Sequence, residues 1–181
     1  TGRNVFDSGD ENGALMMRYA VAGLLNHMPE SMLVFAPHMN SYRRFQNGAH
    51  APTFASWGYE NSTVAVRIPD SECEARRIEH RVAGADANPY LVLAAILGAA
   101  LNGIETKMLP PEPIEGDAYS LSERYKALPN RWELATEAFK DSAFMREYLG
   151  ETFVRVFTAV KEQEQEKIYG RISDVEYEAY L

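Results

Sequence analysis

The chain has 181 residues, a length typical of one domain of about 100–150 residues or slightly more. Hydrophobic residues make up 46% and charged residues 24%, which excludes disordered, collagen-like and disulfide-scaffold chains. The net charge of −8 argues against a nucleic-acid-binding domain. The single cysteine, Cys73, excludes an internal disulfide and suits a reducing compartment, so we expect a cytoplasmic protein. No apolar run approaches the roughly 20 residues that span a bilayer, so no membrane partner is expected.

The N-terminal part alternates between loop and helix. Glycines among Asp and Asn residues predict a loop over Thr1–Gly13. Apolar residues at helical spacing predict a helix over Ala14–His27, which Pro29 should end. The polar segment His38–His50 then reads as an extended loop with a positively charged tip at Arg43 and Arg44.

Three short segments have the alternation of β-strands: 53–57, 63–68 and 76–82. Within the second segment, Arg67 points away from the apolar side because side chains alternate along a strand. In the third, Arg77, Glu79 and Arg81 share one side.

Asn88 as N-cap and Pro89 at the first helical position predict the start of a second helix, which is apolar all round as far as Leu101. Such a helix should be covered on every side. Prolines then mark Met108–Ser120 as a surface loop.

The C-terminal third is predicted to be helical, over Leu121–Leu128, Asn130–Lys140, Ser142–Leu149 and Glu151–Tyr169. In the last of these helices we expect one buried stripe, formed by Phe153, Val156, Phe157 and Val160. The fold class is therefore α+β: a few short antiparallel strands, helices packed on one side, and a helical C-terminal region.

The side carrying Arg77, Glu79 and Arg81 is the most informative local feature, because it places two guanidinium groups beside one carboxylate. It suits an exposed sheet face, and it equally suits a site for an anionic ligand. Arginine presents a planar fork of donors to carboxylate or phosphate, and a glutamate among them could hold a hard cation. Convergence of Arg67 and Arg44 on this side would favour the second interpretation.

Six separated motifs agree in order and spacing with the catalytic domain of the glutamine synthetase superfamily, which the chain resembles along its whole length. The motifs are NSYRR at 40–44, AP at 51–52, WGYEN at 57–61, VRIP at 66–69, RRIEHR at 76–81 and ANPYL at 87–91.

The resemblance implies an ATP-dependent ligase that phosphorylates the γ-carboxylate of glutamate and displaces the phosphate with an amine. Carried over by position, Glu79 matches a Mg²⁺ or Mn²⁺ ligand, and Arg81 and Arg44 match arginines that bind the glutamate substrate. Arg67 and Arg77 resemble arginines that contact the nucleotide phosphates, and Arg67 is also the expected catalytic residue.

Two positions depart from the family pattern. Members that use ammonia have a glutamate just before the AP pair, whereas this chain has His50. The chain is therefore more similar to the γ-glutamylpolyamine or γ-glutamylputrescine branch, with His50 at the amine subsite. Ser62 stands where members usually place an arginine near the transferred phosphoryl group. Because loss of this charge could abolish catalysis, a non-catalytic structural relative is one alternative. Ammonia-using glutamine synthetase is the other alternative.

The resemblance also implies further sequence upstream of this chain and an oligomeric assembly. Residues 1–181 match the C-terminal portion of the catalytic domain, so the β-grasp domain, the other metal ligands and the nucleotide loop should lie upstream of Thr1. Family members build each active site across two subunits, so we expect a homo-oligomeric ring for the full-length protein. We expect no activity for the isolated chain, because the other metal ligands of the family should lie upstream. Tyr119 aligns roughly with a tyrosine that is adenylylated in some bacterial glutamine synthetases.

Overall fold

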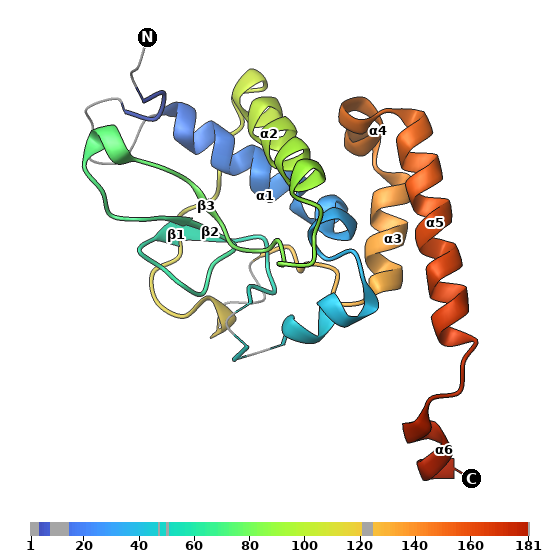
Figure 1. Cartoon of the computed structure of the whole chain (residues 1–181). Helices are drawn as coiled ribbons and strands as arrows, with labels where there is room; N and C mark the ends of the chain where they lie inside the picture. Colours follow the sequence, from blue (N-terminus) through green and yellow to red (C-terminus); the bar gives the residue numbers. More distant parts are fainter. Residues whose placement is uncertain (1–3, 8–14, 47, 50, 121–124, 181) are drawn as a thin grey trace.

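A computed structural model describes residues 4–7, 15–46, 48–49, 51–120 and 125–180 (Figure 1). The fold is α+β, as predicted. A small sheet is covered on one face by helices, and further helices follow toward the C-terminus. Of the predicted N-terminal loop, the structure describes residues 4–7, which form a turn; the remainder lies outside the described residues.

Helix α1 spans Leu15–Phe35 and is longer than the sequence predicted, because Pro29 lies inside it. An internal proline removes one backbone hydrogen bond and costs about 3 kcal/mol. Apolar residues on both sides of Pro29 are buried, among them Leu25, Met28, Met32 and Leu33. Their burial outweighs the cost of the proline, so the helix continues to the end of the apolar run. A 3₁₀-helix, η1 (Met39–Arg44), follows.

The sheet has the order β1-β2-β3, with β1 at Trp57–Tyr59, β2 at Val66–Ile68 and β3 at Glu79–His80. Strands β2 and β3 are antiparallel as expected, but β1 and β2 are parallel, so the prediction of an all-antiparallel sheet was wrong. Three-residue strands span only about 10 Å. The six residues 60–65 are therefore enough to bring the chain back to the N-terminal end of β1, so that β2 can run parallel to it. A second 3₁₀-helix, η2 (Cys73–Ala75), precedes β3.

Helix α2 spans Pro89–Glu105 and begins as predicted: the Asn88 side chain accepts hydrogen bonds from the N–H groups of Tyr90 and Leu91. It lies against α1, with Gly23 and Gly103 at the crossing (Figure 1). The expectation that α2 is covered on every side was wrong for this chain, because one of its faces is exposed. That face carries Tyr90, Leu93, Leu97 and Leu101.

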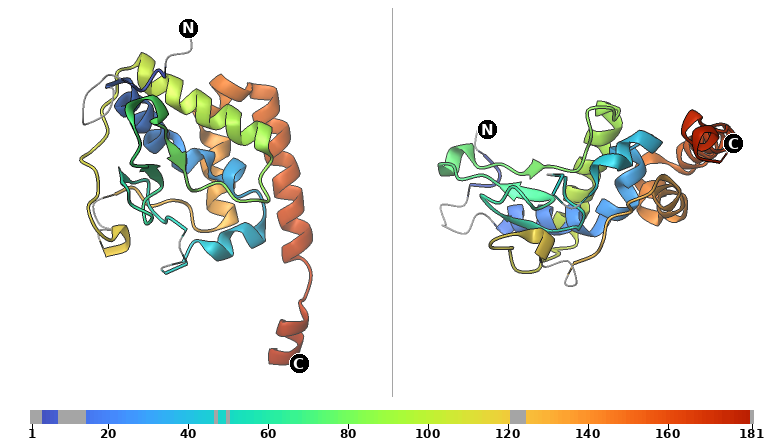
Figure 2. Two further views of the ribbon diagram at one scale, coloured as in Figure 1. Left: turned by 60° about the vertical axis from the view of Figure 1, so that its left-hand side comes forward. Right: turned by 90° about the horizontal axis from the view of Figure 1, so that it is seen from below.

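The C-terminal helices are α3 (Trp132–Asp141), α4 (Ala143–Leu149), α5 (Glu151–Tyr169) and α6 (Asp174–Tyr180). Helices α3 and α4 pack against α1, and α5 packs against α3 and α4. Helix α6 lies away from the body of the molecule and has no buried residue (Figure 2). No helix in the described part of the chain is both long and apolar enough to cross a membrane.

Two predictions in this region were wrong in detail. Residues 125–128 are not helical, because Ala127 pairs with Phe54 in an isolated β-bridge; residues 121–124 lie outside the described residues. In α5, Phe153 and Phe157 are half-buried and pack against the core as predicted, whereas Val156 and Val160 are exposed. The fully buried residues are Val154, Thr158 and Lys161, so the buried face is rotated from the predicted stripe.

Candidate active site

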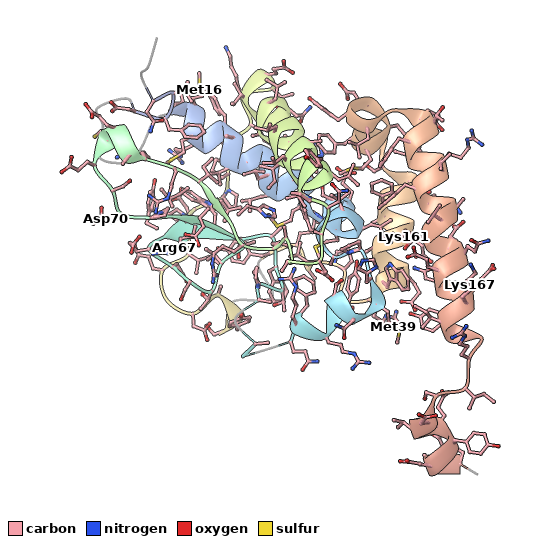
Figure 3. All side chains as sticks on the ribbon, in the orientation of Figure 1. Met16, Met39, Arg67, Asp70, Lys161 and Lys167 are labelled. Carbon is pink, nitrogen blue, oxygen red and sulfur yellow. The ribbon has the colours of Figure 1, made fainter. Side chains whose placement is uncertain are left out.

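Strands β2 and β3 bring Arg67, Glu79 and Arg81 together. Figure 3 labels Arg67 at the small sheet. Arg67 pairs directly with Glu79 across the two strands. The neighbouring residues Val66 and Ile68 are buried on the opposite face, where α1 covers the sheet. Alternation along the strand therefore explains why Arg67 points outward, as the sequence predicted.

The guanidinium group of Arg67 is shared between two carboxylates. Its Nη1 donates to Glu79 Oε2 at 3.2 Å, and its Nη2 donates to both carboxylate oxygens of Glu60 at 3.2 Å. Its Nε is buried and has no hydrogen-bond partner among the described residues. The Arg67 side chain is 29% exposed, so its outer edge remains accessible to a ligand.

Arg81 lies on the other side of Glu79, with its Nε 3.7 Å from Glu79 Oε1. Its Nη1 donates to the carbonyl oxygens of Ser62 and Val64, the latter at 3.2 Å. These backbone contacts fix Arg81 against the link between β1 and β2. Glu79 therefore lies between Arg67 and Arg81, whereas the sequence predicted Arg77 and Arg81 as its neighbours. Two guanidinium groups beside one carboxylate form an arrangement suited to oxyanion binding.

Arg44 occupies a separate position at the end of η1. Its Nη2 donates to the carbonyl oxygen of Val82, one residue beyond Arg81, and its guanidinium lies 4.3 Å from the centre of the Phe45 ring. Burial lowers the pKa of Arg44, although the neighbouring Asp86 carboxylate opposes this shift. Arg44 lines an open hollow of about 490 Å³ together with Asn40, Ser41, Arg43, Gly84, Ala85 and Asp86.

The remaining predicted residues are less tightly held. The side chain of Arg77 is exposed, and its charge contributes to lowering the pKa of Glu60. Ser62 is also exposed and offers its carbonyl oxygen to Arg81. The Tyr119 hydroxyl donates to the carbonyl oxygen of Ala51 at 2.9 Å. His50 lies outside the described residues.

Sequence reasoning gave no role to Glu60, which the structure places beside Arg67, on the side away from Glu79. The hydrogen bond from the Asp70 backbone N–H, followed by those from Arg67, lowers the pKa of Glu60. The available signal was a glutamate directly after a strand, inside the WGYEN motif. Its partner Arg67 lies seven positions further along, too distant for local pattern rules to connect the two.

Glu79 alone does not make up a cation site. A hard divalent cation requires about six oxygen ligands, several of them carboxylates. Among the residues that the structure describes, no group of three or more His, Cys, Asp or Glu side chains could hold a metal ion. The two arginines beside Glu79 further oppose binding of a cation. Among the described residues, Glu79 could therefore contribute one ligand to a cation site but could not form such a site alone.

The sequence model of the glutamine synthetase catalytic domain matches residues 1–180. The chain belongs to the glutamine synthetase family. The arginine and glutamate cluster of β2 and β3 therefore lies within a glutamine synthetase catalytic domain.

Two curated relatives and one solved structure show the range of similar proteins. Gamma-glutamylputrescine synthetase PuuA of Escherichia coli (strain K12) is 41% identical over 180 residues, covering 99% of this chain and 38% of the relative. Type-1 glutamine synthetase 2 of Dictyostelium discoideum is 39% identical over 186 residues, covering 100% and 36%. The structure described as apo GmaS without ligand has a TM-score of 0.84 at 30% identity, covering 98% and 41%. The chain thus spans less than half the length of the relatives it matches.

Proposed function

We propose that the protein containing this chain is an ATP-dependent ligase that joins glutamate to an amine through γ-glutamyl phosphate. The observation that carries the proposal is the Arg67–Glu79–Arg81 cluster within a glutamine synthetase catalytic domain. Phosphoryl transfer requires positioning and charge neutralisation more than covalent participation by the protein. The guanidinium groups of Arg67 and Arg81, held on paired strands, would supply both the positioning and the charge neutralisation.

In the proposed reaction a γ-carboxylate oxygen of glutamate attacks the γ-phosphorus of ATP, and the bond to the ADP oxygen breaks. The amine nitrogen then attacks the acyl carbon, loses a proton, and displaces phosphate that retains the carboxylate oxygen. Arg67 and Arg77 would bind the nucleotide phosphates, with Arg67 neutralising charge at the transferred group. Arg81 and Arg44 would bind the carboxylates of glutamate.

Glu79 would serve as one ligand of a Mg²⁺ or Mn²⁺ ion, with the remaining ligands provided by residues outside this chain. Such a cation neutralises charge on the ATP phosphates. We further propose that residues 1–181 form the C-terminal portion of the catalytic domain, that the full-length protein forms a homo-oligomeric ring, and that it is cytoplasmic. On this basis the isolated chain is inactive, because it lacks most of the metal ligands.

The proposed amine is a polyamine such as putrescine. Support comes from His50 in place of the glutamate found in ammonia-using members, and from the relative named gamma-glutamylputrescine synthetase. Ammonia is the second candidate, supported by the glutamine synthetase of similar identity. A non-catalytic structural relative remains the candidate of another class, because Ser62 replaces a charged residue near the phosphoryl group.

The three candidates separate in a coupled assay of ADP release by the full-length protein with glutamate and a panel of amines. We expect turnover with putrescine to exceed turnover with ammonia. Turnover with ammonia alone would assign glutamine synthetase. No ADP release with any amine, from a protein that still assembles, would favour the structural relative.

A further inference from the structure

Glu60 has an unusual backbone conformation directly after β1. Its φ angle is 48°, in the left-handed region, where Asn and Asp are enriched among non-glycine residues. Conformations of this kind persist only where the surrounding contacts hold them, and they gather at functional sites. A glutamate at this position therefore calls for a functional reason.

Two hydrogen bonds attach Glu60 to the end of β2. Its backbone N–H donates to the carbonyl oxygen of Ile68 at 3.0 Å, and its Oε1 accepts from the backbone N–H of Asp70 at 2.5 Å. The carboxylate is consequently fixed in place, although its side chain is 52% exposed. Fixing both ends of the residue accounts for the retention of its strained φ angle.

The fixed carboxylate accepts hydrogen bonds from Arg67 Nη2 through both of its oxygens at 3.2 Å. Arg67 Nη1 meanwhile donates to Glu79. Without Glu60, both terminal nitrogens of Arg67 would be free to pair with Glu79 alone. The guanidinium would then rotate toward β3, and Glu79 would be more strongly engaged.

We propose that Glu60 is a positioning residue: it holds Arg67 in the orientation that binds nucleotide phosphates. This inference rests on the proposed function of Arg67 as a phosphate ligand. Glu60 acts through Arg67; it lies inside the WGYEN motif, but the family resemblance assigned it no role. It also leaves one Glu79 oxygen, Oε1, outside the contact with Arg67.

The test measures ADP affinity by calorimetry on the full-length protein, with Glu60→Gln and Glu60→Asp. Gln keeps an acceptor for the Asp70 N–H but removes the charge that holds Arg67. Asp keeps the charge and suits the left-handed backbone, but it is one methylene shorter and does not reach Arg67. We expect both variants to weaken ADP binding about fivefold, as expected for loss of a half-exposed ion pair.

The matched control is Glu72→Gln, which removes the same charge from an exposed side chain with no cap hydrogen bond, at the start of η2. It should leave ADP affinity unchanged. In an Arg67→Gln background, Glu60→Gln should have no further effect, because its action passes through Arg67. A general electrostatic or folding effect of Glu60→Gln would instead add to the effect of Arg67→Gln.

The outcomes separate this inference from the proposed function. A folded wild-type protein that binds no ADP would overturn the proposed function and this inference together. Normal wild-type binding with unaffected Glu60→Gln, or additive effects with Arg67→Gln, would overturn this inference alone. If Glu60→Gln fails to fold, Glu60→Asp decides by the same criterion.

Discussion

Gly23 in α1 and Gly103 in α2 pack backbone against backbone where the two helices cross. A Cβ added at Gly103 would lie 2.2 Å from the Tyr19 carbonyl oxygen and 2.6 Å from the Gly23 nitrogen. Neither backbone atom can move without separating the helices. The crossing therefore depends on the absence of a side chain at both positions, and α1 in turn supports the covered face of the sheet.

Gly103→Ala should destabilise the fold by about 2 kcal/mol or more, because overpacking exceeds the gain of about 1 kcal/mol in helix propensity. Gly98→Ala in the same helix is the matched control, since its Cβ would meet the Tyr148 ring at 2.7 Å, and a ring can rotate aside. Chemical unfolding measures both. Equal losses of stability in the two variants would contradict this account of the crossing.

Glu30 links α1 to the start of α4 through a half-buried polar cluster. Its carboxylate lies 2.5 Å from His27 Nδ1 and accepts a hydrogen bond from the Ser142 hydroxyl at 2.5 Å. Burial alone would raise the pKa of Glu30, but the hydrogen bonds with His27 and Ser142 hold it below the ordinary value of 4.5.

Because its pKa is depressed in the folded state, Glu30 contributes stability that is present above pH 4.5 and lost as the pH falls below it. Glu30→Gln should therefore lower stability at neutral pH and flatten the loss of stability between about pH 4.5 and 3. Unfolding free energies across that range measure the effect, with Glu112→Gln in the exposed loop as control. An unchanged pH slope in Glu30→Gln would contradict the prediction.

His80 should act in a different pH window. Burial, with a smaller contribution from the charge of Arg44, lowers the pKa of His80 from 6.5 to about 4, and neither ring nitrogen has a hydrogen-bond partner among the described residues. The unfolded chain binds this proton below pH 6.5 and the folded chain does not. Stability should therefore fall as the pH decreases from about 6.5 to about 4, by up to about 3 kcal/mol.

His80→Phe keeps a ring against Phe35, whose ring centre lies 4.5 Å away, and cannot be protonated. It should remove the decrease in stability between pH 6.5 and 4 while leaving the steeper acid unfolding below pH 4.5. Unfolding free energies at several pH values distinguish the two windows. A variant with the wild-type slope would show that His80 is not responsible.

Sequence patterns predicted the contacts that depend on local periodicity. Alternation predicted that Arg67 points away from the buried side of β2, and the Asn88–Pro89 signal located the start of α2. The patterns failed where contacts between residues far apart in the sequence determine the local structure. Burial around Pro29 extends α1, the Ala127 bridge to Phe54 replaces a helix, and Glu60 meets Arg67 only because a tight link folds back. In each case the stabilising residues are too far apart in the sequence for a local pattern to connect them.

Manganese binding tests the proposal that this chain holds only part of a cation site. The 181-residue chain should bind Mn²⁺ only weakly and should not hydrolyse ATP, because Glu79 lies between two arginines without further carboxylate ligands. In the full-length protein Mn²⁺ binding should be tight, and Glu79→Gln should weaken it strongly. Micromolar binding to the 181-residue chain that Glu79→Gln abolishes would contradict the proposal.

The proposed ligase chemistry is tested most directly by following the γ-carboxylate oxygen of glutamate. Full-length protein is supplied with ATP, putrescine and glutamate labelled with ¹⁸O in the γ-carboxylate, and the released phosphate is analysed by mass spectrometry. A γ-glutamyl phosphate intermediate predicts one ¹⁸O atom in each phosphate released. Phosphate without label, formed at the same rate as ADP, would contradict the proposed reaction.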